Sequence, residues 1–433
     1  MSSLESTLAA AKPPGLHPGF VYDVIPTSTA IVDRRQSVSA YPTSATSLSQ
    51  NGTRSCRISI GSDGFCDASS IRLMFTINNL DTTKQLRPYS RPWGCWSTVR
   101  LMSQGTLLES LDHYGRHHEF FGFQLLPLQD QWSEAAVTGI HGSWGAGMDQ
   151  LQPKLGRIEP NKRVTVLHKL NLSLFNSQKI LPLRYCPLEL DMTLAAAKDW
   201  VDTVTLTAGN PSFSSNYSIS DIRVIYDMVL PDESLIAQFY SGLLNNQIMS
   251  IPVLCAYQFS HSIVDGATSV DITASRAFSK ISSIWVSFSG NVDNLNGDFR
   301  LPVNMDQGFG VNPNLDTGSP GWAPSIRMSI GGKSYPDPAP ADTIAMQYYH
   351  LQKALGYSPN ITRDDYMFDT YAYVFDTKRV PFDHGSGISS RSGDLIRIEV
   401  KNLDPAREAK IAHVTMFCYA VVAIREISVQ LLD

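Results

Sequence analysis

The stretch SISDIRVIYDMVLPDESLIAQFYSGLLNN occupies residues 218–246, close to the midpoint of a chain of 433 residues. Its first part alternates between apolar and other residues, and this period of two predicts a β-strand. The apolar positions that share one face of this strand are Ile222, Val224, Tyr226 and Met228. After the acidic start at 231–233, apolar residues recur at helical spacing, which predicts a helix over 232–246. A helix at the centre of a chain that otherwise predicts strands is typical of a link between two similar halves.

The composition points to a large folded protein with extensive subunit contacts. A length of 433 residues suits two or three domains. The hydrophobic fraction of 43% is ordinary, but the charged fraction is only 17%, against about 25% in soluble domains. A weakly charged surface on so long a chain favours burial against other subunits, because large obligate interfaces resemble a domain core. The net charge of -5 argues against a general nucleic-acid-binding surface.

The cysteines and the N-terminus indicate where the protein is made. Six cysteines are scattered without any C-x-x-C pair, which favours reduced, buried thiols, with a Cys56–Cys66 bridge as the alternative. The first residues, MSSLESTLAAAKPPG, lack the basic start and apolar core of a signal peptide. No apolar run approaches the ~18 residues of a membrane span. We therefore expect a soluble protein made in the cytosol.

Short alternating segments predict strands along most of the chain. Residues 1–45 are rich in Ser, Thr, Ala and Pro, and we expect an arm that is disordered or ordered only against a neighbour. A helix is expected over 343–355, capped by Asp342 and ended by Gly356, and residues 112–126 look partly helical. Long loops are expected at about 129–160 and 290–324. The strands are expected at 55–60, 71–79, 97–102, two short ones within 163–175, and then at 181–195, 219–230, 249–263, 269–273, 279–290, 325–330, 372–376, 394–402 and 412–432.

A weak internal repeat supports two like halves. The segment from Trp96 to Met102 and the segment from Trp322 to Met328 each contain an aromatic residue, an Arg and a Met, and each precedes a Gly turn and a helical stretch. They lie about half the chain apart, which favours duplication over coincidence. We therefore predict a mainly β fold of two tandem antiparallel eight-stranded jelly rolls, with short helices between strands and linking the halves. The expected parts are an arm at 1–45, a first jelly roll at 46–230 and a second at 231–433, which starts with the linking helix 232–246.

The segment HYGRHHEFF contains the best candidate for chemistry. His113 and His117 are four residues apart, so on a helix they would share a face and could bind zinc. The H-E-x-x-H pattern is absent, because Glu119 follows His118, and a third ligand such as His141 would have to come from elsewhere. A polar helix at a contact or on the surface is the favoured interpretation.

Other candidate sites lack the pattern that their chemistry needs. His261 with Asp265 and His384 with Asp383 could be fragments of a catalytic set, but no motif supplies a nucleophile. Tryptophans near Gly and Pro could stack on a sugar, although packing of loops is the more common role; they are Trp93, Trp96, Trp132, Trp144 and Trp322. We therefore expect no enzyme, no catalytic, cofactor-binding or metal-ligating residue, and no cofactor.

Several segments, taken in order, resemble the double jelly-roll major capsid proteins of double-stranded DNA viruses, most of all those of virophages and polinton-like viruses. The resemblance covers roughly residues 50–433 and depends on order and architecture more than on single motifs. The segments are SIRLMFTINN (70–79), CWSTVRLMSQGTLLESLDHYG (95–115), LPLRYCPLELDMTLAAAKDW (181–200), YSISDIRVIYDMVLPDESLIAQFYSGLLNNQIMSIPV (217–253) and RSGDLIRIEVKNLD (391–404).

The resemblance implies a structural role in a virion. Three copies would form a pseudo-hexameric capsomer that tiles an icosahedral shell, beside penton and minor or cement proteins and without specific nucleic-acid contacts. The arm at 1–45 would become ordered on the inner face after assembly. Two alternatives stay open: a carbohydrate- or receptor-binding β-sandwich such as a fibre or lectin, and a jelly-roll enzyme with a metal at His113 and His117.

Overall fold

The computed structural model describes nine main ranges of the chain. They are 32–126, 158–201, 213–231, 248–290, 324–356, 371–378, 387–403, 409–425 and 428–432, without positions 63, 87, 89–90, 178, 275, 338 and 392–393; residues 130, 236–237, 241, 361 and 366 are also described. The expected loops 129–160 and 290–324 fall almost entirely outside these ranges. Of the expected linking helix, only residues 236, 237 and 241 are described, and these are helical.

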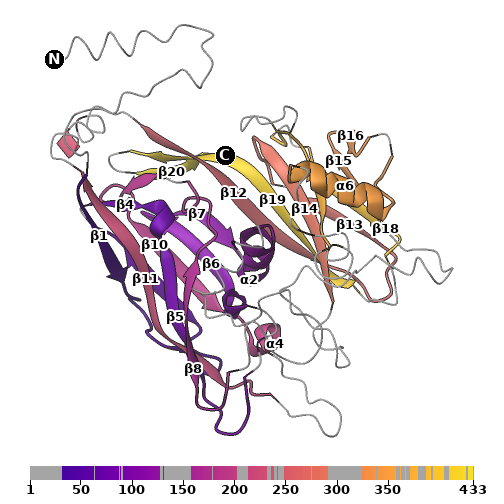
Figure 1. The fold of residues 1–433 in the computed structure, drawn as a ribbon. Coiled ribbons are helices and arrows are strands. Elements are labelled where there is room, and N and C mark those ends of the chain that lie inside the picture. Colours follow the sequence, from indigo (N-terminus) through magenta and orange to yellow (C-terminus); the bar gives the residue numbers. More distant parts are fainter. Residues whose placement is uncertain are drawn as a thin grey trace, which may run out of the picture.

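The first half of the chain forms a sandwich of two antiparallel sheets (Figure 1). The four-stranded sheet has the order β3 (Ser55–Ile60), β10 (Leu188–Leu194), β6 (Trp96–Ser103) and β7 (Thr106–Leu111). In the seven-stranded sheet β11 (Tyr217–Pro231) is central. Along one edge of β11 lie β5 (Arg72–Asn79), which pairs in turn with β8 (Arg163–Lys169), and β4 (Phe65–Asp67), which pairs in turn with β9 (Ile180–Pro182). Along the other edge lie β1 (Val32–Ala40) and β2 (Leu48–Ser49).

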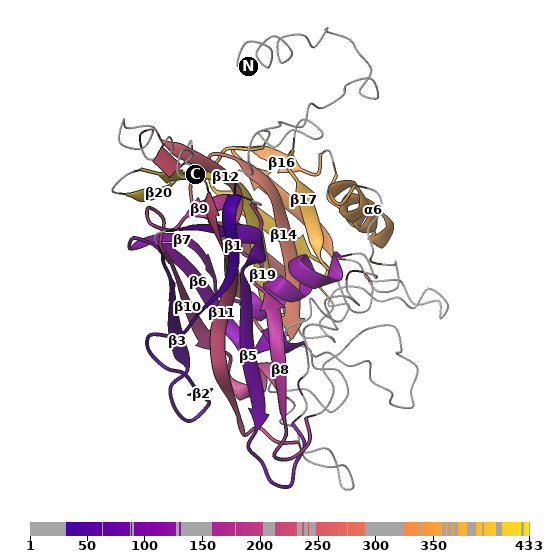
Figure 2. The same ribbon diagram turned by 60° about the vertical axis from the view of Figure 1, so that its left-hand side comes forward.

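The second half forms a second sandwich beside the first, as Figures 1 and 2 both show. The five-stranded sheet has the order β12 (Met249–Ser262), β19 (Ala409–Ile424), β14 (Ile281–Gly290) and β17 (Tyr373–Asp376), with β20 (Val429–Leu432) on β19. The four-stranded sheet has the order β13 (Ser269–Ala274), β18 (Ile396–Lys401), β15 (Ser325–Ile330) and β16 (Lys333–Tyr335). The helices are η2 (Ala68–Ser70), η3 (Pro92–Cys95), α2 (Tyr114–His117), the π-helix η4 (His118–Gln124), α4 (Ala197–Trp200) and α6 (Ile344–Ala354).

Eight strands of each sandwich follow the same order and pair in the same way. In the large sheets, β1-β11-β5-β8 corresponds to β12-β19-β14-β17. In the small sheets, β3-β10-β6-β7 corresponds to β13-β18-β15-β16. Two-residue turns with positive φ join β6 to β7 at Gln104 and Gly105, and β15 to β16 at Gly331 and Gly332. These are the strands of the predicted internal repeat, so the expected fold of two eight-stranded sandwiches is confirmed, with β2, β4, β9 and β20 added.

Alternation along β11 agrees with the midpoint strand expected from the sequence, but with a break. Ile222, Val224 and Tyr226 are buried as expected, and Met228 is half-buried. Ile219 is also buried, three positions before Ile222, because a bulge shifts the register between residues 220 and 223. An extra residue in one strand reverses which side chains face the core.

Three local expectations are wrong. Residues 32–40 are not an arm that needs a neighbour, because they form β1 on the chain's own strand β11; residues 1–31 lie outside the described part. The cap of α6 is Thr343, whose side chain accepts a hydrogen bond from the Met346 N–H, and not Asp342. A Cys56–Cys66 bridge is also absent, and all six cysteines are buried thiols.

Two clusters of buried apolar side chains hold the molecule together, one inside each sandwich. The first cluster also takes in residues of the second half, namely Ile251, Val253 and Cys255 of β12 and Val422 of β19. Both long strands therefore run from one core into the other. Within the described ranges, no helix has the length and apolar character to cross a membrane.

Candidate functional site

The segment that follows β7 lies where the two sandwiches meet. Helices α2 and η4 pass directly into one another at His118, and Figure 1 shows α2 between the sheets of the two halves. Gly115 permits this position, because a Cβ there would lie only 2.8 Å from the Cα of Gly94 in η3. The corresponding helix of the second half, α6, instead covers the outer side of its sandwich in both views (Figures 1 and 2). The partly helical stretch expected at 112–126 is thus confirmed.

Side chains of this segment join the second sandwich. The Arg116 guanidinium donates to the carbonyl oxygen of Phe288 at 2.9 Å and to the hydroxyl of Ser287 at 3.3 Å. Phe120 is fully buried and belongs to the second core, although it follows a strand of the first sandwich. Phe121 packs edge-on against Trp285, with ring centroids 5.2 Å apart. A polar anchor and two aromatic rings therefore hold the two halves as one body.

The candidate metal ligands are placed in this interface but do not converge on a common point. The ring of His113 packs edge-on against that of His413, with centroids 4.9 Å apart, while His117 packs against Phe121 at 4.9 Å. Burial lowers the pKa of His117 to about 3, so its imidazole is neutral. No group of three or more ligand-type side chains occurs in the described part of the chain. His141 lies outside that part.

His118 and Glu119 belong to a different cluster, buried in the first sandwich. The Glu119 carboxylate forms an ion pair with Arg91 and accepts a hydrogen bond from the Trp93 indole at 2.8 Å. The ring of His118 packs edge-on against that of His168, with centroids 4.3 Å apart. Because the charges are paired and fully enclosed, this cluster orients α2 and η4 and has no access for a substrate. The alternation of strand 163–169 places His168 on the face that is directed into the core. The rest of the cluster could not be predicted from a local pattern, because its members come from three separate segments of the chain.

Glu109 was not singled out by the sequence, yet it joins the two halves. Its carboxylate accepts hydrogen bonds from the backbone N–H of Ser173 at 2.7 Å and of Ala256 in β12 at 3.1 Å. Burial raises the pKa of Glu109 to about 7. It also lines a cavity of about 410 Å³ between the halves, whose wall includes Tyr257 and Arg276. The Arg276 guanidinium lies 4.1 Å from the Tyr257 ring centroid.

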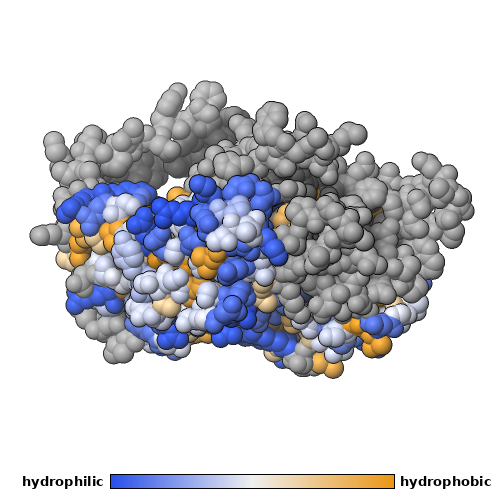
Figure 3. Space-filling view, turned by 90° about the horizontal axis from the view of Figure 1, so that it is seen from below, coloured by the Kyte–Doolittle hydropathy of each residue, from blue (hydrophilic) through white to orange (hydrophobic). Residues whose placement is uncertain are grey.

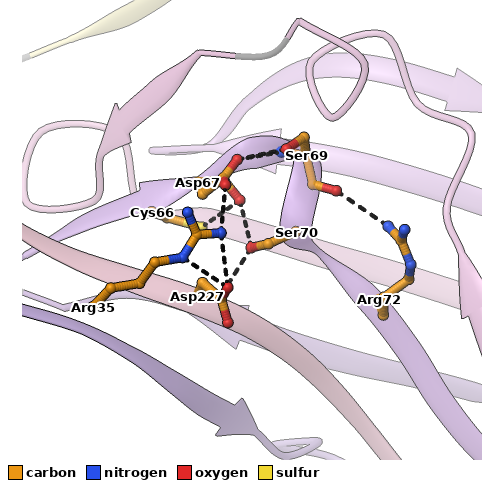
Figure 4. Close-up of polar contacts among 7 residues, drawn as sticks. All are labelled: Arg35, Cys66, Asp67, Ser69, Ser70, Arg72 and Asp227. Atoms are coloured by element: carbon orange, nitrogen blue, oxygen red, sulfur yellow. Dashed lines mark hydrogen bonds and ion pairs between the residues drawn. The ribbon is translucent and has the colours of Figure 1, made fainter.

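A second polar cluster holds β1 on the first sandwich (Figure 4). The Arg35 guanidinium of β1 lies 2.8 Å from an Asp227 oxygen on β11 and 2.9 Å from an Asp67 oxygen at the end of β4. Asp67 is fixed from the other side, because it accepts hydrogen bonds from the N–H and the hydroxyl of Ser69. Hydrogen bonds from Ser69 and the charge of Arg35 lower the pKa of Asp67 against the opposing effect of its partial burial. The backbone N–H of Asp227 donates to the Ser70 hydroxyl at 2.8 Å. We call Asp67 and Asp227 the acidic pair.

The remaining candidates do not form a site. His261 and Asp265 are both exposed near the end of β12, and His384 and Asp383 lie outside the described residues. Trp93 and Trp96 are fully buried, so neither ring can stack on a sugar. The other three tryptophans that were considered as sugar platforms (132, 144 and 322) also lie outside the described residues.

Comparison with known proteins identifies the fold. No family model and no curated protein matches the sequence. PBCV-1 VP54, as fitted into a reconstruction of the virophage Sputnik, is 11% identical with a TM-score of 0.63, covering 95% of this chain and 98% of that one. The Faustovirus major capsid protein is 9% identical, with a TM-score of 0.59 and coverage of 95% and 93%. The mavirus major capsid protein is 10% identical, with a TM-score of 0.52 and coverage of 96% and 93%. The chain therefore has the double jelly-roll fold of these structures over nearly its whole length.

Proposed function

We propose that this chain is the major capsid protein of an icosahedral virus, and that three copies form a pseudo-hexameric capsomer. Each copy would contribute two sandwiches, so that a trimer presents six similar units around its axis. Six like units can fill a six-fold position in a shell with only three chains. The role is mechanical, and we do not expect an enzyme.

The observation that carries this proposal is the full-length agreement with capsid structures, which includes both sandwiches and their order. A fold alone does not establish a function. Here, however, the geometry adds a reason: the interface between the halves is buried and built from both. A capsomer needs each chain to act as one rigid two-lobed block, and Arg116, Phe120 and Glu109 provide that rigidity.

The distribution of polar residues fits such a block. The lower end of the molecule in Figure 1, where strands β5, β8 and β11 end, is mainly hydrophilic in its described part (Figure 3). In the proposed shell the strands stand across the wall, so strand ends face solvent and the sandwich flanks face other subunits. The low charged fraction of 17% agrees with flanks that are covered.

The proposal also assigns partners and a place. The protein would be made in the host cytosol and end in the virion capsid. Its main partners would be further copies of itself within and between capsomers, with penton and minor or cement proteins at the remaining positions. We expect no sequence-specific contact with nucleic acid, in keeping with the net charge of -5.

The test is assembly of the purified protein. Under conditions of high protein concentration and moderate salt, we expect negative-stain images with hexagonal particles that order into sheets or closed shells. A glycan array with the same preparation provides the contrast, because a lectin or fibre would bind defined sugars. Glycan binding by a protein that never forms hexagonal particles would reject the proposal.

A further inference from the structure

Strand β1 occupies the same place in the first sandwich as β12 does in the second, but it is held much less firmly. Each lies along the outer side of the longest strand of its half, β11 or β19. In β12, Ile251, Val253 and Cys255 are buried in a core. In β1, no side chain from Arg34 to Ala40 is buried, and only Val38 and Ala40 touch the core. The backbone ladder therefore supplies most of the attachment of β1.

The strongest side-chain anchor of β1 is built on the rest of the protein. Ser69 holds the carboxylate of Asp67, Ser70 holds the backbone of Asp227, and both serines lie outside β1. Both carboxylates contact the same guanidinium nitrogen of Arg35, and without that cation between them their like charges would repel each other. The edge of β11 and the acidic pair together thus form a site that fits an extended segment with an arginine at one fixed register (Figure 4).

The connection behind β1 allows the strand to reach another molecule. Residues 41–47, YPTSATS, join β1 to Leu48, which is fully buried. This connection contacts β3, because the Thr43 N–H donates to the Arg57 carbonyl oxygen at 2.8 Å and the Arg57 N–H donates to the Ser44 hydroxyl at 3.0 Å. Seven extended residues span roughly 24 Å. Among the described residues, β1 pairs with β11 alone, so its release breaks one ladder and the short contact of residues 42–44 with β3.

We propose that the edge of β11 with the acidic pair is a docking site for β1 of a second copy of the chain, so that neighbouring copies exchange β1 when they assemble. The inference rests on the proposed self-assembly and adds the contact that connects the copies. Exchange re-forms the same backbone ladder and the same Arg35 contacts in the partner, so its free-energy cost is confined to residues 41–47. Exchange of an identical element is a low-cost route to linked subunits.

Disulfide trapping between two populations tests the exchange. One population carries Ser39→Cys on β1 and the other carries Ile225→Cys on β11, two positions that face each other in the ladder. Native thiols do not interfere, because all six cysteines are buried. The two are mixed, assembled and oxidised, and we expect a reducible band at twice the chain mass. The double variant Ser39→Cys/Ile225→Cys, kept dilute, should close the bond within one chain and so shows that pairing survives both substitutions.

The second sandwich supplies a matched control. Ser262→Cys on β12 and Ile411→Cys on β19 form the equivalent pair, and no dimer is expected because β12 is anchored in a core. A Ser39–Ile225 dimer no more abundant than this control would overturn the exchange. If capsomers and shells still form in that case, the proposed function stands and only the exchange fails. If neither particles nor dimers form, both proposals fail.

Discussion

At the scale of single residues, Glu109 should make stability depend on pH. Burial raises its pKa from an ordinary value near 4.5 to about 7. Between these values the native state holds a proton that the unfolded state has released, so the free energy of unfolding falls as pH rises through this window. We expect Glu109→Gln, which mimics the protonated form, to lose less stability than the wild type between pH 5 and pH 7.5 in urea titrations.

Comparing the pH dependence of stability in the wild type and in Glu109→Gln separates the effect of Glu109 from that of the buried histidines. The pKa values of His117 and His168 are lowered from 6.5 to about 3, so between these values both histidines make stability rise with pH. This effect is common to both proteins and cancels in their difference. Equal losses of stability in wild type and Glu109→Gln would mean that the carboxyl group is already ionised in the folded protein at pH 5.

His117 should behave as a packed neutral side chain. Its Nδ1 is buried without a hydrogen-bond partner, which disfavours the native state relative to an apolar residue. Below pH 6.5 the His117 imidazole is protonated in the unfolded state but stays neutral in the native state, so the free energy of unfolding falls as the pH is lowered. We expect His117→Leu to cost under about 1.5 kcal/mol at pH 7 and to gain on the wild type at pH 5. Zinc that raises the melting temperature of the wild type alone would instead indicate a metal site.

At the scale of elements, the bulge in β11 depends on Asp221. This exposed residue has φ of 53°, in the left-handed region that β-branched side chains avoid. We expect Asp221→Val to lower the free energy of unfolding by about 1–3 kcal/mol, and Asp221→Gly to leave it unchanged or raise it. Chemical denaturation of both variants measures this difference. Equal stability of the two would show that the bulge is not maintained by the backbone conformation of this residue.

Elements with a strong local pattern could be predicted, and those that depend on distant partners could not. Alternation identified β11, and the apolar stripe with Gly356, which has φ of 83°, identified α6. Strand β1 was missed because RRQSVSA buries no side chain and is held by its ladder to a strand 192 residues away in sequence at the Arg35–Asp227 contact. The bulge was also missed, since one inserted residue leaves both flanking patterns intact.

The same limit applied to the interface between the halves. The segment 113–124 was noticed for its histidines, but its role comes from Arg116, Phe120 and Phe121, which meet residues of the second half. Glu109 lies in the strand TLLESL, where a single acidic residue is usually taken as solvent-facing. Only the approach of β12 encloses it, and that packing is not encoded in any local pattern.

At the scale of the whole molecule, the two sandwiches should unfold together. Phe120 belongs to the first half in sequence and to the second core in space, and β12 and β19 enter the first core. We expect one calorimetric transition for the wild type, and Phe120→Ala to lower its stability by about 3–5 kcal/mol without splitting that transition. Two separate transitions in the wild type would contradict a rigid two-lobed block.

The most direct test of the central claim is the mass of the purified protein in solution, measured by light scattering together with images of the same fraction. The chain mass is 47.8 kDa, and the account predicts a particle of three times that mass with a hexagonal outline. A stable monomer that persists at high protein concentration would contradict the capsomer.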